Sequence, residues 1–109
     1  MQHKDLTVGR WGKLSLVEQL ANIGSEVIRA TNWQEKGNAE YATLAFYRAL
    51  ELIDLTLDQP LGESRLRELT RMRETLVDYF FGENIYVSTA SSWQSYFGAF
   101  TFAAARMRS

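Results

Sequence analysis

Arg73 and a set of carboxylates are the residues best suited to chemistry. Arg73 occurs within an apolar helical spacing, where a guanidinium must reach the edge of the core or pair with a carboxylate. Glu51 and Asp54 are three residues apart, and Glu74 and Asp78 are four residues apart, so each acidic pair shares one helix face. An arginine and paired carboxylates could together bind a nucleotide or another phosphate ester, with Mg²⁺ between carboxylate and phosphate. The candidate binding residues are Arg73, Glu51, Asp54 and Asp78.

The same residues have a structural interpretation. An ion pair between Arg73 and a carboxylate of another helix would fix the register of the two helices, and if it were buried Arg73→Ala would cost a few kcal/mol. The candidate partners are Glu26, Glu51, Asp54 and Asp58. Arginines interleaved with acidic residues are also typical of solvated helix faces. This interpretation predicts no bound metal ion and no cofactor.

Composition argues against most catalytic machinery. The chain of 109 residues has no cysteine, and its single histidine is His3, near the N-terminus. We therefore expect neither a cysteine nucleophile nor a histidine general base, and we predict no catalytic residue. The net charge of −1 gives no general attraction to nucleic acid or to an anionic membrane. The lack of cysteine fits a cytoplasmic location.

One segment resembles a membrane span at first sight. Residues 84–105 contain no charged side chain. Serine, threonine and glutamine interrupt the segment, however, so it lacks the roughly 20 continuous apolar residues that a membrane span needs. We expect a buried helix there and no membrane association.

Start and stop signals predict the first two helices. Ser15 and Glu18 form a capping box, and Gly37 supplies a left-handed stop. Asn38 can cap a second helix, which should end near Asp58 because a proline follows two residues later.

Similar signals predict two further helices. The third begins around residue 63 or 64 and stops at Gly82. Its inward positions are Leu66, Leu69, Leu76 and Phe80. After a polar loop, Ser91 and Gln94 form a second capping box that starts the last helix.

Together these elements predict an all-α fold. Short connections favour antiparallel neighbours, and hence an up-down four-helix bundle or two stacked helical hairpins. We expect residues 1–14 to form an extended N-terminal segment and residues 15–109 to form a single four-helix domain.

The last helix carries more aromatic surface than a single core stripe needs. Its aromatic residues are Trp93, Tyr96, Phe97, Phe100 and Phe102. Full burial in the monomer is one interpretation. Otherwise these residues form an interface with another subunit or a partner, for which aromatic anchors are well suited. Trp11 could pack over the bundle or join this surface.

Small and aromatic residues recur at particular spacings in the first hairpin. They are Ala30, Trp33, Gly37, Ala42, Phe46 and Ala49. On these residues the segment 30–52 resembles one tetratricopeptide repeat, in which alanines let two antiparallel helices approach and aromatics fill the adjacent gaps. The resemblance covers one hairpin, and the chain has no second copy at the repeat length, so it implies a similar hairpin and not a repeat protein.

A second resemblance concerns residues 73–79. The arginine, polar and aromatic residues of this segment resemble the motif of the HEPN family, small helical bundles of which many are dimeric ribonucleases. Asp78 stands where that family has its histidine. The resemblance therefore implies an inactive, RNA-associated relative.

These observations favour a non-enzymatic protein–protein interaction module, forming a homodimer or another homo-oligomer or joining a protein partner. The alternatives are a nucleotide or phosphate-ester binding protein or hydrolase, and an inactive HEPN-like protein.

Overall fold

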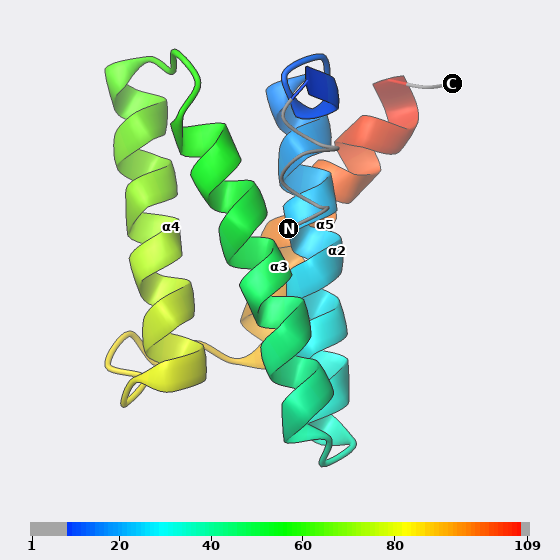
Figure 1. The fold of residues 1–109 in the computed structure, drawn as a ribbon, viewed down its shortest axis with the longest axis vertical. Helices are drawn as coiled ribbons and strands as arrows, with labels where there is room; N and C mark the ends of the chain where they lie inside the picture. Colours follow the sequence, from blue (N-terminus) through cyan, green and yellow to red (C-terminus); the bar gives the residue numbers. More distant parts are fainter. Residues whose placement is uncertain (1–8, 108–109) are drawn as a thin grey trace.

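The computed structural model describes residues 9–107, in which every regular element is a helix (Figure 1). The four long helices are α2 (Leu16–Glu35), α3 (Ala39–Leu57), α4 (Glu63–Phe81) and α5 (Ala90–Met107). The prediction of an all-α fold is confirmed. None of the helices in this range is long and apolar enough to cross a membrane. His3 lies outside the described residues.

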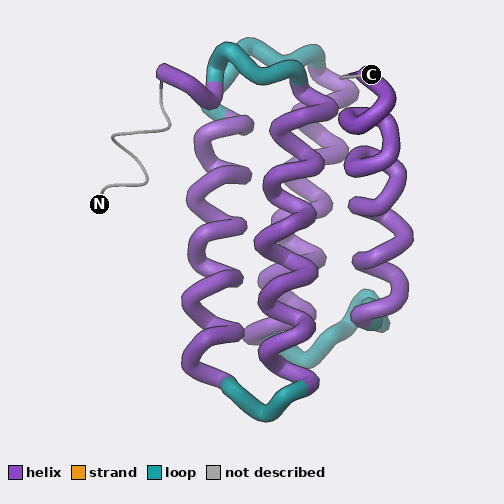
Figure 2. Tube along the Cα trace, turned by 90° about the vertical axis from the view of Figure 1, so that its right-hand side faces the viewer, coloured by secondary structure: helices purple, strands orange, loops and turns teal. Residues whose placement is uncertain are grey.

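The four helices run alternately down and up (Figure 1). α2 and α3 form a central antiparallel hairpin, α4 packs against α3, and α5 packs against α2. Figure 2 shows the helices side by side, with the connecting loops at the two ends of the bundle. Of the two predicted architectures, the up-down bundle fits this order, since α4 and α5 cover different helices of the central hairpin.

The caps of the central hairpin are those that the sequence predicts. The Ser15 hydroxyl accepts from the backbone N–H of Glu18 at 3.1 Å, and the Glu18 carboxylate accepts from the backbone N–H of Ser15 at 3.0 Å. Gly37 has φ +79°, the left-handed conformation expected after a helix. The Asn38 side chain accepts from the backbone N–H of Tyr41 at 3.0 Å, which starts α3.

The predicted start of α5 is wrong by a few residues. The reciprocal capping bonds join Thr89 and Ser92: each side-chain oxygen accepts from the backbone N–H of the other residue, at 3.0 and 2.9 Å. The helix therefore begins at Ala90, before the predicted Ser91–Gln94 box. A hydroxyl residue begins both boxes, with its partner three residues later, and the earlier box forms the cap.

The core lies where the three helix pairs meet. The largest fully buried apolar side chains are Phe46, Phe97, Leu20, Ile23, Ile53, Leu69, Leu76 and Val27. On α4 the buried stripe is Leu69, Met72 and Leu76, whereas Leu66, which we predicted to point inward, is 44% exposed. Met72, which lines a pocket with Trp93 and Tyr96 of α5, is thus buried where the sequence pattern alone favoured Leu66.

The N-terminal segment is not extended in its described part. Residues 9–11 form a helical turn, and the backbone N–H of Leu14 donates to the Trp11 carbonyl at 3.1 Å. The Trp11 side chain is buried, and its indole N–H donates to the Thr56 hydroxyl at 2.9 Å. The Gln19 amide also donates to the Trp11 carbonyl, at 2.7 Å. The indole covers the end of the α2–α3 hairpin, so the folded domain includes residues that we had placed outside it.

Candidate functional site

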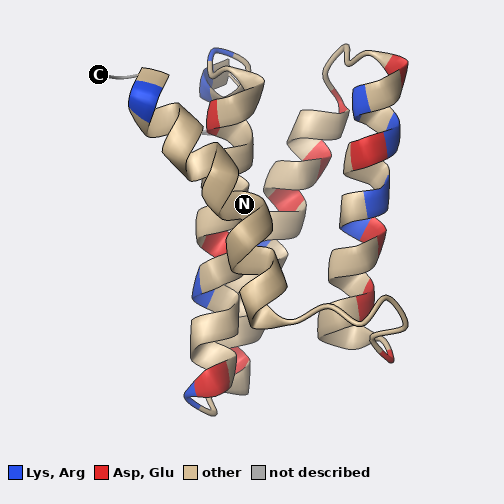
Figure 3. Ribbon diagram, turned by 180° about the vertical axis from the view of Figure 1, so that it is seen from behind, with Lys and Arg blue, Asp and Glu red and all other residues tan. Residues whose placement is uncertain are grey.

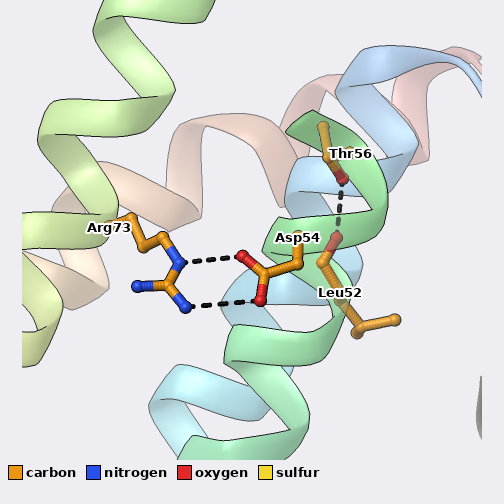
Figure 4. Close-up of polar contacts among 4 residues, drawn as sticks. All are labelled: Leu52, Asp54, Thr56 and Arg73. Atoms are coloured by element: carbon orange, nitrogen blue, oxygen red, sulfur yellow. Dashed lines mark hydrogen bonds and ion pairs between the residues drawn. The ribbon is translucent and has the colours of Figure 1, made fainter. Parts of the chain in front are cut away.

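Arg73 reaches from α4 to Asp54 on α3, as Figure 4 shows. The guanidinium donates from Nε to Oδ1 at 2.8 Å and from Nη2 to Oδ2 at 3.3 Å. Asp54 is one of the four predicted partners. The side chains of Arg73 and Asp54 are 36% and 57% exposed, so the pair lies at the edge of the α3–α4 contact and not in the core. Water therefore reaches both groups, and the guanidinium both reaches the edge of the core and pairs with a carboxylate.

The predicted acidic residues fall into two places. Glu51, Asp54 and Asp58 lie on one face of α3 and, with Leu55, line a shallow hollow of about 220 Å³. Asp78 is not part of this group: its Oδ2 accepts from the backbone N–H of Tyr86 at 3.1 Å and so holds the loop after α4. Within residues 9–107, no three histidine, cysteine or acidic residues are grouped so as to hold a metal ion.

Arg73→Ala should lower the free energy of unfolding by less than about 1 kcal/mol, because exposed ion pairs contribute about 0–1 kcal/mol. Arg67→Ala is the matched control, since Arg67 pairs with Glu63 at 3.0 Å on the exposed face of α4. Urea unfolding should show similar losses in the free energy of unfolding for the two variants. A loss above about 2 kcal/mol for Arg73→Ala alone would mean that its ion pair is shielded from water.

The predicted α5 interface is largely part of the monomer. Trp93 and Phe97 are 6% and 0% exposed, and Phe97 packs on Gly24 of α2. Tyr96 and Phe100 are half-buried, and Phe102 alone of the five is exposed, at 65%. Trp93 and Phe97 therefore belong to the core of the monomer, and little of either side chain is left to contact a partner. Figure 3 shows that charge is concentrated on α4, while α5 is almost free of it.

The loop at residues 82–89 was missed by the sequence analysis, which treated it as a polar connection. Ile85, Tyr86 and Val87 are 75%, 59% and 77% exposed, although all three are large and apolar. The signal was present as three consecutive apolar residues in a segment without helical periodicity.

Hydrogen bonds hold this loop in one conformation. The Asn84 side chain donates to the Ser88 carbonyl at 2.9 Å and accepts from the Ser88 N–H at 2.8 Å. The Asp78 carboxylate binds the Tyr86 N–H. Asn84 and Val87 have φ of 55° and 54°, a left-handed conformation that is uncommon for asparagine and rare for a β-branched residue. The loop is therefore ordered and strained, with its apolar side chains facing solvent.

Two exposed aromatics extend this apolar surface. Phe81, at the end of α4, and Tyr47, on α3, have ring centroids 5.8 Å apart, and both side chains are about half-exposed. We define the loop surface as Tyr47, Phe81, Ile85, Tyr86 and Val87. It differs from the interface that we predicted on α5.

A groove lies between α4 and α5. It has a volume of about 280 Å³ and is lined by Glu68, Arg71, Met72, Thr75, Trp93 and Tyr96. The Tyr96 hydroxyl lies 3.4 Å from the Glu68 carboxylate, to which it donates. The indole N–H of Trp93 is buried and has no hydrogen-bond acceptor among residues 9–107. A buried donor without an acceptor costs about 1–3 kcal/mol.

Tyr96 makes the stability of the fold sensitive to high pH. Burial, and next the neighbouring Glu68 carboxylate, raise the pKa of Tyr96 to about 12 from 10.0. The unfolded chain loses this proton first, so the stabilisation is complete below pH 10 and is lost as the pH rises toward 12. Burial also raises the pKa of Tyr79.

The urea midpoint of the wild type should therefore fall across this pH window, and Tyr96→Phe should show a shallower fall because the substituted ring cannot titrate. Absorbance of tyrosinate reports the titration directly. Equal slopes for the two proteins would mean that the Tyr96 hydroxyl titrates like an exposed one.

Comparison with family models, curated proteins and solved structures gave no match.

Proposed function

We propose that this protein is a non-enzymatic helical interaction module that forms a homo-oligomer through the loop surface. The observation that carries the proposal is the exposure of Ile85, Tyr86 and Val87 on a loop held by internal hydrogen bonds. Large apolar side chains grouped at a protein surface are typical of sites that another protein covers.

The order of the loop supports a binding role. A recognition loop that is already fixed loses little conformational entropy on association, and its apolar side chains then contribute more of their burial energy to affinity. Strained backbone is more common at binding and catalytic sites than elsewhere. A glycine at position 87 would remove the strain, yet the chain has valine there.

The phosphate-ester alternative is less well supported by the geometry. The Arg73 guanidinium is engaged by Asp54, and Glu51 and Asp58 add negative charge on the same helix face. A phosphate would meet repulsion from these carboxylates. Asp78, the position shared with the HEPN motif, binds the loop backbone instead of facing Arg73.

Sedimentation of the wild type at micromolar to high micromolar concentration should show a dimer or a larger oligomer. Ile85→Ser combined with Tyr86→Ser should weaken association about tenfold or more, because central apolar anchors of an interface typically contribute over 1 kcal/mol each.

Phe102→Ser is the matched control, since Phe102 is equally exposed but lies on α5. It should leave the oligomer unchanged. If Phe102→Ser dissociated the oligomer and the loop variant did not, the interface would lie on α5 and not on the loop surface. A wild-type monomer at high micromolar concentration would contradict self-association.

A further inference from the structure

The backbone of the loop at Tyr86 is held on the face of α4 that lines the α4–α5 groove. Arg71 and Thr75 line the groove, and Asp78 follows Thr75 by three residues and Arg71 by seven. Residues at these spacings lie along one helix face. Since Asp78 binds the Tyr86 backbone, the loop begins where the groove ends.

The groove fits side chains of the kind that the loop exposes. Its walls include Met72, Trp93 and Tyr96, and its volume is about 280 Å³. An apolar cavity of about 150 Å³ accepts benzene, so this groove is large enough for a tyrosine ring or an aliphatic side chain. The loop of the same chain is tied to Asp78 at the end of the groove, and its apolar side chains are exposed, so they do not fill the groove.

From this complementarity we infer that two copies of the chain pair about a two-fold axis, with the loop tip of each copy seated in the α4–α5 groove of the other. The inference rests on the proposed function and names its partner and contact. A projection and a matching groove on one face form a closed dimer, because a two-fold axis makes both contacts at once.

Charge supports the same pairing. Arg71, at the rim of the groove, and Glu83, in the loop, are both exposed, and neither forms an ion pair within the described part of the chain. In an antiparallel pairing of the two α4 helices about an axis beside Val77, Arg71 of one copy lies opposite Glu83 of the partner subunit.

Charge reversal tests the pairing. We expect Arg71→Glu and Glu83→Arg each to weaken the dimer about tenfold or more, because each change places like charges opposite one another twice in a two-fold dimer. An equimolar mixture of the two single variants should recover a dimer of wild-type affinity, since both contacts then join opposite charges. Circular dichroism checks that each variant is folded, and sedimentation measures the association.

The pairing is overturned if either single variant dimerises as well as the wild type, or if the mixture stays as weak as its components. If those results occur while the Ile85→Ser, Tyr86→Ser variant still dissociates, self-association through the loop stands and only the groove contact is wrong. A wild-type monomer would overturn the proposed function and this pairing together.

Discussion

Gly24→Ala should lower the free energy of unfolding by about 3 kcal/mol, at the upper end of the cost of overpacking a core. A Cβ at position 24 would lie 2.5 Å from Cβ of Phe97 and 2.8 Å from its Cγ. Side-chain rotation cannot relieve the first of these contacts, because Cβ is fixed to the backbone. α5 would have to move away from α2, and Phe97 would lose its packing. Replacing Phe97 by leucine should not rescue the variant, since leucine keeps the same Cβ.

Gly98→Ala is the matched control for this prediction. Gly98 is also helical, but a Cβ there meets nothing within 4 Å. Alanine should therefore stabilise the helix by about 0.5–1 kcal/mol through its higher helix propensity. Urea unfolding of both variants measures the contrast. If Gly24→Ala were as stable as Gly98→Ala, α5 would not sit on α2 in the manner described.

Phe46→Ala should cost about 3–5 kcal/mol, as is usual when a buried phenylalanine is removed. Phe46 is completely buried in α3, and its ring centroid lies 4.3 Å from that of Phe80 and 5.1 Å from that of Phe81. These rings join the end of α4 to α3. The loss is a large part of the roughly 5–15 kcal/mol that stabilises a domain, so α4 should separate before the rest of the bundle unfolds.

Hydrogen exchange and urea unfolding test this second prediction. In Phe46→Ala, amides of α4 should lose protection to a greater extent than those of α2. Tyr47→Ala is the neighbouring control: Tyr47 is 51% exposed, so truncation should change stability by less than about 1 kcal/mol. Uniform loss of protection across all helices would show that α4 is not a separable unit.

Helix ends that depend on neighbouring residues were predictable from the amino-acid sequence. The Ser15–Glu18 box, the left-handed Gly37 and the Asn38 cap all occur as expected. A cap joins groups within about four residues of one another, so the information needed is present in the local sequence. The start of α5 was misplaced because Thr89 and Ser91 offer similar local chemistry.

The candidate site was predictable only in part. The need of Arg73 for a carboxylate follows from its spacing, and Asp54 was one of four candidates. The packing of α4 against α3 decides which carboxylate Arg73 meets, and it also decides that the pair is exposed. The assignment of Trp93 and Phe97 to the core depends in the same way on the docking of α5 against α2.

Amphipathic spacing and capping signals in the chain were thus sufficient to specify four helices and most of their buried positions, because hydrophobic periodicity and capping act over a few residues. The packing of those helices decided the rest: the inclusion of Trp11 in the core, the groove beside Trp93, and the outward Ile85, Tyr86 and Val87. These features arise from contacts between residues far apart in the chain, or from a loop held by Asp78 of the preceding helix, and neither kind of contact has a periodic signature.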